Sequence, residues 1–456
     1  MKSLKLFILR LTEIILLPIS LFAFAIYLPF KCFRSFRRAD VIILPEKMNF
    51  GTTVYLPDLA RRMYPGRNVI FLVFRELSHN RIIPEIWREV ENIDYLNLSR
   101  CGISQVLLGR AISLPNRKAF DPLAVKIVEL LIGLVGRSPL VIRNRLDLYK
   151  HVDVPRSVRE AITTALARAP GDPELEMYDS DAPYYTLFSL RDETWMRNPC
   201  LSRKRCDEVE GKLEKARNNK KNTRLCGLYI KRDSGNELHT RTAVELSRRE
   251  GSEFKAYLPA VRFLVERGFQ VLLTGDVAMP LDVAEEFCGM FVDGDVIGAD
   301  PNVFKAYAAL HTDIFIGDNG GGWSFAGLVA ERSMLGLNNY PFSDADGKFW
   351  LYYKHVFDER GNQVPFCDMA QKYSFHNRRD GESLPEGFQI LANSADEILG
   401  AVRFYVDEVE CPGSSQLDPS LEDLWAAYSQ FKISGSHISP AFVKNYHKKR
   451  ALADVA

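Results

Sequence analysis

The sequence has almost no excess of charge, with 59 Lys and Arg residues against 58 Asp and Glu residues and a formal net charge of +1. A global field that would attract nucleic acid is therefore excluded, and any anion site has to be local. Low-complexity tracts and repeats at solenoid spacing are also absent. The composition is that of a globular protein, and 456 residues are enough for two domains with additional segments.

Paired cysteine motifs are missing as well. The eight cysteines are scattered, and the two closest, Cys200 and Cys206, lack the CxxC spacing of zinc and redox sites. Cys226 and Cys288 lie within apolar runs, as small buried residues do in a reducing compartment. The pattern predicts no metal cage and favours the cytosol.

One long uncharged run is present, the 17 residues from Ile14 to Phe30, and basic residues flank it on both sides. It is short for a spanning helix and contains Pro18 and Pro29, so a spanning and an interfacial helix are both open. Cleavage after Ala25, as in a signal peptide, is a third alternative. We interpret residues 1–38 as a membrane anchor with a basic collar that keeps the body of the protein in the cytoplasm.

The first half opens with the alternation of a parallel α/β sheet. A strand is predicted at Val41–Leu44, a helix over about 55–64 and a second strand at Val69–Phe74. Helical patterns follow at Ala124–Val135 and Pro155–Ala167, and Pro183–Leu190 is a further candidate strand. Together they predict a Rossmann-like domain over residues 39–200. The polar stretch 201–224 has no interleaved aromatic residues and is interpreted as a linker with a solvated helix, not as a nucleic-acid patch.

The second half alternates more clearly. Strands are predicted at Leu225–Ile230, Phe269–Leu273 and Asp313–Ile316, and helices at Ser252–Arg267, Val303–Leu310 and Ser324–Leu335. This order predicts a second Rossmann-like domain over residues 225–410. Residues 411–456 are predicted to form a helical tail, with a helix at Leu421–Phe431.

The sharpest local signal is an apolar strand that leads into a glycine-rich turn and then a helix. Its candidate substrate-binding residues are Gly317, Asp318, Asn319, Gly320, Gly321 and Gly322. Because glycines let an anion approach the backbone N–H groups of a helix start, the pattern favours a diphosphate. It is neither a GxGxxG fingerprint nor a Walker loop, and a purely conformational role stays open. Trp323 can stack on a ligand, but packing on the sheet is favoured.

A second signal is Arg232, in the Lys-Arg-Asp sequence that ends the strand at 225–230. Ligands gather at the carboxyl ends of strands in open α/β sheets, and the guanidinium group can bind a pyrophosphate with two hydrogen bonds. An ion pair with Asp233 is the alternative. Arg249, before the helix at Ser252, is a further cationic candidate, with a solvated helix start as its alternative.

Four other residues are candidates. Glu46 and Asp58 flank the loop after the first strand and can act as the general base for an acceptor hydroxyl, although Asp58 is equally explained by the helix dipole. Asn338 and Asn339 can line a nucleotide pocket, with turn formation before Pro341 as the alternative.

Several motifs resemble those of a family of bacterial surface-glycan glycosyltransferases. They are Gly227–Ser234, Arg249 at 17 residues after Arg232, Ala256–Asp276, Asp313–Pro341 and Phe50–Phe71, and they cover most of residues 40–345. The resemblance implies two Rossmann-like domains in the GT-B architecture, metal-independent transfer, and a phosphate-binding arginine at Arg232, as in fucosyltransferase-like enzymes. The sequence departs from the family at three positions. Asp318 and Asn319 stand where the family tends to have Thr or Ser, and Glu250 stands where the family has Asn.

We therefore expect a hexosyl- or fucosyl-type glycosyltransferase that moves a sugar from a nucleotide-diphosphate donor to a glycan or lipid-linked acceptor. Its expected place is the cytoplasmic face of a bacterial inner membrane, in surface polysaccharide biosynthesis, without a cofactor. Two alternatives stay open: a sugar-nucleotide epimerase or hydrolase of the same shape, and an inactive membrane-tethered binding or scaffold protein, suggested by Asp318 and Asn319. Asp344-Ala345-Asp346 keeps a metal ion possible.

Overall fold

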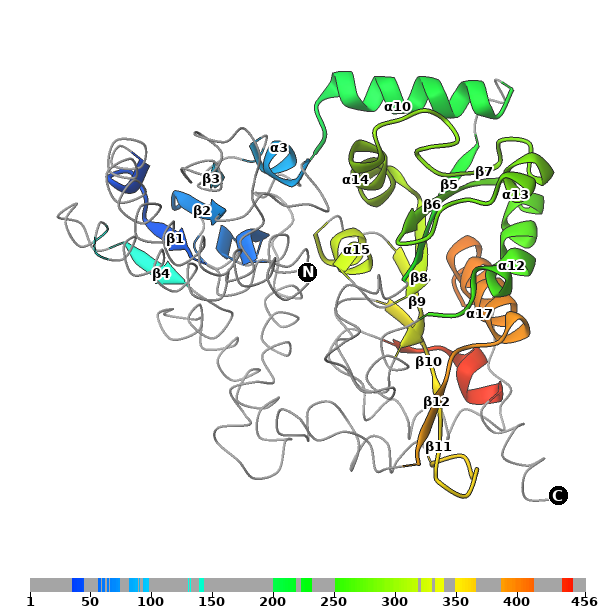
Figure 1. Cartoon of the computed structure of the whole chain (residues 1–456). Helices are drawn as coiled ribbons and strands as arrows, with labels where there is room; N and C mark the ends of the chain where they lie inside the picture. The colour runs from blue at the N-terminus through cyan, green and yellow to red at the C-terminus, as the bar shows by residue number, and fades with distance from the viewer. Residues whose placement is uncertain are drawn as a thin grey trace, which may run out of the picture. The chain divides into compact units, whose positions relative to one another are not determined.

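The computed structural model of the chain divides into two compact units, Met1–Val154 and Pro155–Ala456. Each unit contains a parallel β-sheet, so the predicted α/β class is confirmed (Figure 1). The division falls before the boundary that the sequence suggests at residues 201–224. The structure describes residues 35–44, 56–58, 60–61, 64, 66–73, 82–88, 90, 93–97, 130, 132, 139–142, 200–218, 223–231, 251–318, 321–329, 333–339, 349–365, 387–413 and 437–445.

The first unit is built on a four-stranded sheet with the order β3-β2-β1-β4, in which all strands are parallel. The strands are β1 (Val41–Ile43), β2 (Val69–Val73), β3 (Ile93–Asn97) and β4 (Leu140–Ile142), and helix α3 (Ile83–Arg88) precedes β3. The first two strands confirm the sequence prediction, and residues 56–58 and 60–61 are helical within the predicted helix. The elements predicted at Pro155–Ala167 and Pro183–Leu190 lie outside the described residues.

The second unit contains a seven-stranded sheet with the order β13-β10-β9-β8-β5-β6-β7, and every neighbouring pair is parallel. Its strands are β5 (Arg224–Ile230), β6 (Phe269–Gly275), β7 (Phe291–Val292), β8 (Ile314–Asp318), β9 (Ser333–Asn339), β10 (Phe349–Tyr353) and β13 (His437–Ile438). Numbered along the chain, the six strands from β7 to β10 have the order 3-2-1-4-5-6 of the doubly wound nucleotide-binding fold.

Helices cover both faces of this sheet (Figure 1). Helices α12 (Phe254–Glu266) and α17 (Ala395–Glu410) pack on one face, where they cover the buried side chains of Leu228, Ile316 and Leu337. The other face holds α14 (Pro301–His311) and α15 (Gly321–Ser324), and α13 (Leu281–Glu286) connects β6 to β7. The two layers of helices thus cover both faces of the described sheet (Figure 1).

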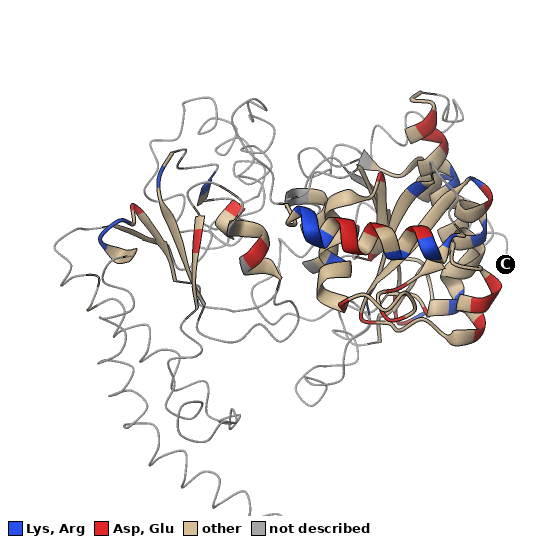
Figure 2. Cartoon of the chain, turned by 90° about the horizontal axis from the view of Figure 1, so that it is seen from above, with Lys and Arg blue, Asp and Glu red and all other residues tan. Residues whose placement is uncertain are grey.

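Most of residues 201–224, interpreted as a linker with a solvated helix, is helical. Residues Arg203–Ala216 form α10, which buries Val209 and Leu213 beside α14. The guanidinium group of Arg217 then donates to Gln270 Oε1 of β6 at 3.1 Å. Lys, Arg, Asp and Glu alternate along the outer side of the helix (Figure 2). The solvated helix was therefore foreseen, but its attachment to the second sheet was not.

The predicted helix at Ser324–Leu335 is also shorter than expected. Helical geometry covers α15 and a π-helical turn at Phe325–Val329, and β9 already begins at Ser333. The residues Ser333 to Leu335 pair with Ile314 to Ile316 of β8. A short apolar run fits a buried strand as well as a helix, which is why the pattern alone did not separate them.

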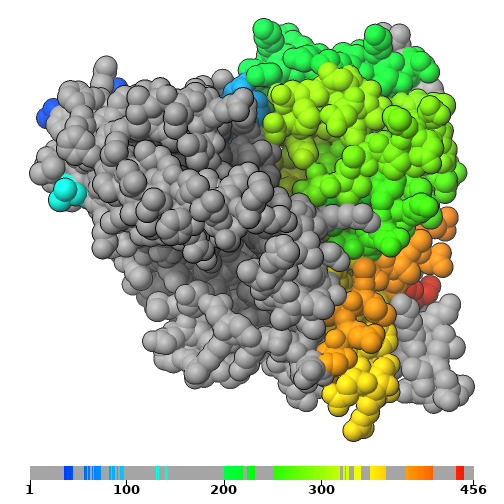
Figure 3. Space-filling model, in the orientation of Figure 1, coloured from blue at the N-terminus to red at the C-terminus, as the bar shows by residue number. Residues whose placement is uncertain are grey.

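The end of the chain adds smaller elements. Strands β11 (His355–Phe357) and β12 (Gln389–Leu391) form an antiparallel pair that projects from the second unit (yellow and orange in Figure 3). The helix predicted at Leu421–Phe431 lies outside the described residues. Among the residues that the structure describes, no helix has the length and apolar character needed to cross a membrane. The run from Ile14 to Phe30 is not one of them, so its membrane role stays a prediction.

Candidate functional site at the carboxyl ends of β5 and β8

The order of the strands creates one distinctive edge in the second unit. From β5 the chain passes through α12 to β6 and β7 on one side, and α14 returns it to β8 on the other side of β5. In open α/β sheets, ligands bind beyond the carboxyl ends of the strands at such a reversal. Strand β5 ends at Ile230 and β8 at Asp318, so the residues that follow both strands start at the same edge.

The two candidate arginines are close in sequence to residues at this edge. Arg232 and Arg249 themselves lie outside the described residues, but Lys231 and Gly251 are described. The backbone N–H of Gly251 donates to the carbonyl oxygen of Lys231 at 3.1 Å. Lys231 and Gly251 therefore lie side by side, and in the sequence each arginine is within two residues of one of them.

The carboxyl group of Asp318 is buried and contacts the interior of the unit. It accepts hydrogen bonds from the hydroxyl group of Tyr257 at 2.5 Å, from Asn338 Nδ2 at 2.8 Å and from the backbone N–H of Lys231 at 2.9 Å. Burial raises the pKa of Asp318, while these donors and nearby Lys354 act in the opposite direction. A carboxylate repels a nearby diphosphate, and the three protein donors around the Asp318 carboxyl group reduce this repulsion.

Asn338 has a left-handed backbone, with φ of +51°. Asparagine tolerates this conformation better than most residues. Its side chain consequently lies on the α12 side of the sheet, where it contacts Asp318 and Tyr257. Its backbone N–H donates to Asn393 Oδ1 and its Oδ1 accepts from the backbone N–H of Asn393, both at 2.7 Å. Asn338 is therefore part of a buried network at the end of β9, not of an open turn.

Asn339 lies on the other side of the sheet. A Cβ atom on Gly336 would be 2.6 Å from Asn339 Nδ2 and 2.9 Å from the indole ring of Trp323. Asn339 and Trp323 are fully buried, and among the described residues the Asn339 carboxamide has no hydrogen-bond partner. The packing alternative for Trp323 thus fits the structure, while the nucleotide-binding role of Asn339 stays a prediction.

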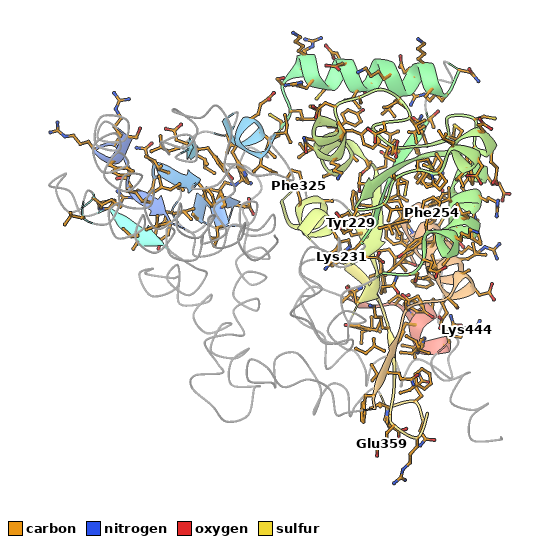
Figure 4. All side chains as sticks on the ribbon, viewed as in Figure 1. Tyr229, Lys231, Phe254, Phe325, Glu359 and Lys444 are labelled. Carbon is orange, nitrogen blue, oxygen red and sulfur yellow. The ribbon has the colours of Figure 1, made fainter. Side chains whose placement is uncertain are left out.

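The glycine turn is shaped by contacts with Tyr229 of β5. A Cβ atom on Gly317 would overlap with the backbone of Tyr229, and a Cβ atom on Gly322 would be 2.6 Å from its ring. The backbone N–H of Gly322 donates a hydrogen bond to the Tyr229 hydroxyl group. Figure 4 shows Tyr229 and Lys231 where β5 approaches α15. These two glycines therefore have a conformational role, and the amide of Gly322 already has a protein partner; Asn319 and Gly320 lie outside the described residues.

The two candidate bases belong to the first unit. Asp58 is fully buried, and Arg61 Nε donates a hydrogen bond to its Oδ1 at 2.8 Å, while Arg61 Nη2 lies 2.6 Å from the same oxygen as part of the ion pair. This buried ion pair gives Asp58 a structural partner that the helix-dipole alternative did not include. Glu46 lies outside the described residues.

The described side chains offer little for a metal ion. No three His, Cys, Asp or Glu side chains among them lie close enough together to hold one. Asp344 and Asp346, which keep a metal possible in the sequence, lie outside the described residues.

Four residues around the site were not singled out from the sequence: Tyr229 beside the glycine turn, and Tyr257, Ser252 and Asn393 in the buried network. Tyr229 lies near the end of β5, two residues before Lys231. This position at the carboxyl end of a strand could have marked it as a site residue. Tyr257, Ser252 and Asn393 lie at the starts of α12 and α17, where capping is the ordinary expectation. Ser394 indeed forms a capping box with Glu397.

Comparisons with known proteins give only weak similarities. No protein-family model and no curated protein matches the chain. The crystal structure of a glycosyl transferase family 9 protein from Veillonella parvula DSM 2008 is 11% identical, with 69% of this chain and 86% of that chain covered and a TM-score of 0.37. The structure of POFUT1 in complex with GDP is 10% identical, with 69% and 97% covered and a TM-score of 0.30. These values are too low to assign the chain to either family.

Proposed function

We propose that this chain is a glycosyltransferase of the GT-B type that binds a nucleotide-diphosphate sugar at the carboxyl ends of β5 and β8. The strand order 3-2-1-4-5-6 is the observation that supports the proposal most directly. It brings the residue before Arg232 and the start of the glycine turn to one edge, as a shared diphosphate site requires. The parallel sheet of the first unit, which has the partial order 3-2-1-4, is consistent with a second Rossmann-like domain.

The chemistry follows from the leaving group. Negative charge grows on the nucleoside diphosphate as the bond to the sugar breaks, and groups that bind it best at that moment accelerate transfer. Arg232 and the backbone N–H groups of Gly320, Gly321 and Gly322 would supply this stabilisation without a metal ion. Arg249 would add positive charge at the same edge. Asp318 would act through the protein and not by contact with the sugar.

The acceptor side is the less supported half of the proposal. The general base would be Glu46, since Asp58 is held in the ion pair with Arg61. The acceptor would be a glycan or lipid-linked sugar at the cytoplasmic face of a bacterial inner membrane, which residues 14–30 would contact. Surface polysaccharide biosynthesis and hexosyl or fucosyl transfer follow from the family resemblance alone.

A binding or scaffold protein is the second candidate, because the Gly322 amide is engaged by Tyr229 in this structure. The full chain, solubilised in detergent, should be incubated with UDP-, GDP- and dTDP-linked sugars, and nucleoside diphosphate release followed with and without a bacterial membrane lipid extract. Acceptor-dependent release supports transfer. Donor turnover without acceptor favours an epimerase or hydrolase, and donor binding without turnover favours the scaffold.

A further inference from the structure

Lys231 and Gly251, which flank the segment 232–250 in the sequence, both lie beside the carboxyl group of Asp318. Asp318 Oδ2 accepts a hydrogen bond from the backbone N–H of Lys231 at 2.9 Å, and the carbonyl oxygen of Lys231 accepts one from Gly251 at 3.1 Å. Gly251 itself lies so close that any Cβ atom there would overlap with Asp318 Oδ2. One carboxylate oxygen therefore contacts both ends of the segment.

The other oxygen, Oδ1, is fixed by groups from two further elements. The hydroxyl group of Tyr257 in α12 donates to it at 2.5 Å, and Asn338 Nδ2 at the end of β9 donates at 2.8 Å. Ser252 supports both donors, because its backbone N–H donates to the Tyr257 hydroxyl and its own hydroxyl lies 3.1 Å from Asn338 Oδ1. The carboxyl group cannot shift without breaking several buried hydrogen bonds.

We propose that Asp318 is a positioning residue: it fixes Lys231 and Gly251, the two residues that flank the segment 232–250 to which Arg232 and Arg249 belong. That the arginines bind a nucleoside diphosphate rests on the proposed function. A neutral side chain would fill the same space with a smaller desolvation cost, whereas a carboxylate accepts stronger hydrogen bonds from the groups that fix the segment. The negative charge of Asp318 is therefore better explained by its contacts with Lys231 and Gly251 than by packing.

Two variants disturb the contact of Asp318 with Lys231 and Gly251, one by changing the carboxyl group and the other by changing Gly251. Asp318→Asn keeps an oxygen for Tyr257 and Asn338 but turns an NH2 group toward the Lys231 N–H, so that two donors face each other. Gly251→Ala leaves the carboxylate intact and places a methyl group where Oδ2 lies. Tyr405→Phe is the control, because it removes a part-buried hydrogen bond of 2.9 Å to Ser333 at the opposite end of β9.

The first measurement needs no ligand. Limited trypsin digestion of the full chain in detergent, followed by mass spectrometry, gives the cleavage rate at Arg232, Arg248 and Arg249 relative to exposed Arg360 as internal reference. Releasing the ends should raise this ratio about tenfold in Asp318→Asn and in Gly251→Ala, by the strength of a charge-assisted hydrogen bond, and leave Tyr405→Phe unchanged. Equal ratios in all variants, or an equal rise in the control, would overturn the positioning role.

The second measurement tests the link to the ligand. Binding of UDP and GDP by titration calorimetry should weaken about tenfold or more in Asp318→Asn. If Asp318 acts through Arg232, the Asp318→Asn, Arg232→Ala double variant should bind no more weakly than Arg232→Ala alone, whereas additive losses contradict the positioning role. A wild-type chain that binds neither nucleotide, with the digestion ratio still raised in the variants, sinks the proposed function and leaves Asp318 as the residue that positions the segment.

Discussion

The hydroxyl group of Tyr229 accepts a hydrogen bond from the backbone N–H of Gly322 and so occupies one of the amides proposed to bind the diphosphate. The ring also fills the space that the missing side chain of Gly322 leaves. A ligand that uses this amide has to displace the hydroxyl, and a ligand that does not use it leaves the contact intact. Removing the hydroxyl group should therefore change nucleotide binding in the first case and leave it unchanged in the second.

Tyr229→Phe should lower the free energy of unfolding by about 1 kcal/mol, because a buried N–H loses its partner. It should also increase the thermal stabilisation that saturating UDP or GDP produces, since no hydroxyl has to be displaced. Thermal unfolding of both proteins with and without nucleotide measures both effects. An identical nucleotide-induced shift in the variant would remove Gly322 from the anion site.

Arg232→Ala should weaken donor binding or turnover by roughly 1.5–3 kcal/mol, the contribution of a charge-assisted hydrogen bond. Titration with UDP and GDP, and the rate of diphosphate release, measure the loss. Arg262→Ala is a suitable control, because this half-exposed arginine of α12 pairs with Glu286 at 2.8 Å. Donor affinity and rate equal to those of the wild type would exclude Arg232 from the site.

Gly321 and Gly322 should respond differently to a side chain. Gly322→Ala places a Cβ atom 2.6 Å from the Tyr229 ring and should destabilise the fold by about 1–3 kcal/mol through overpacking. Gly321→Val should reduce turnover more than stability if a phosphate approaches this backbone. Urea unfolding and diphosphate release, measured on both variants, separate the cases, and equal losses for Gly321→Val would favour a conformational role.

Much of the second sheet could be predicted because buried parallel strands are continuous apolar runs. Leu225–Ile230 and Phe269–Leu273 were therefore recognised, and β5 and β6 extend them by one and two residues. Strand β7 has only two residues and gave no pattern. Helix α10 has just two buried residues in a charged stretch, so its attachment to the sheet was invisible to a periodicity argument.

The site was predictable where it follows from strand ends and unpredictable where it depends on distant partners. Arg232 and the glycine turn follow β5 and β8 directly, so their common edge could be inferred from an alternating sequence. The inward orientation of Asp318 needs Tyr257, which is 61 residues away, and a left-handed backbone at Asn338. Neither is encoded in the residues next to Asp318.

Glu397 should be a strong determinant of stability in the second unit. It is buried, accepts from Ser394 N at 2.8 Å and lies 2.6 Å from His355 Nε2, while Gln363 Nε2 is 2.8 Å from the other ring nitrogen. Glu397→Gln should cost about 1–3 kcal/mol, because charge-assisted hydrogen bonds become neutral and an NH2 group faces a donor. Asp396→Asn, at the neighbouring exposed position, should change the free energy of unfolding, measured by urea titration, by about 0.5 kcal/mol at most. Similar losses in both variants would mean that only helix charge matters.

The pH dependence of stability should reveal the buried Asp318. Burial raises its pKa in the folded chain above the ordinary value of 3.8, so the folded state takes up this proton before the unfolded state does. As the pH falls through the folded pKa towards 3.8, this group therefore adds stability relative to neutral pH, and below 3.8 its contribution is constant. Asp318→Asn cannot take up the proton. The unfolding free energy of the wild type minus that of the variant, from urea titrations between about pH 7 and pH 4, should rise on acidification. Other acidic groups cancel in this difference, and a difference that falls instead would show that the donors around Asp318 outweigh its burial.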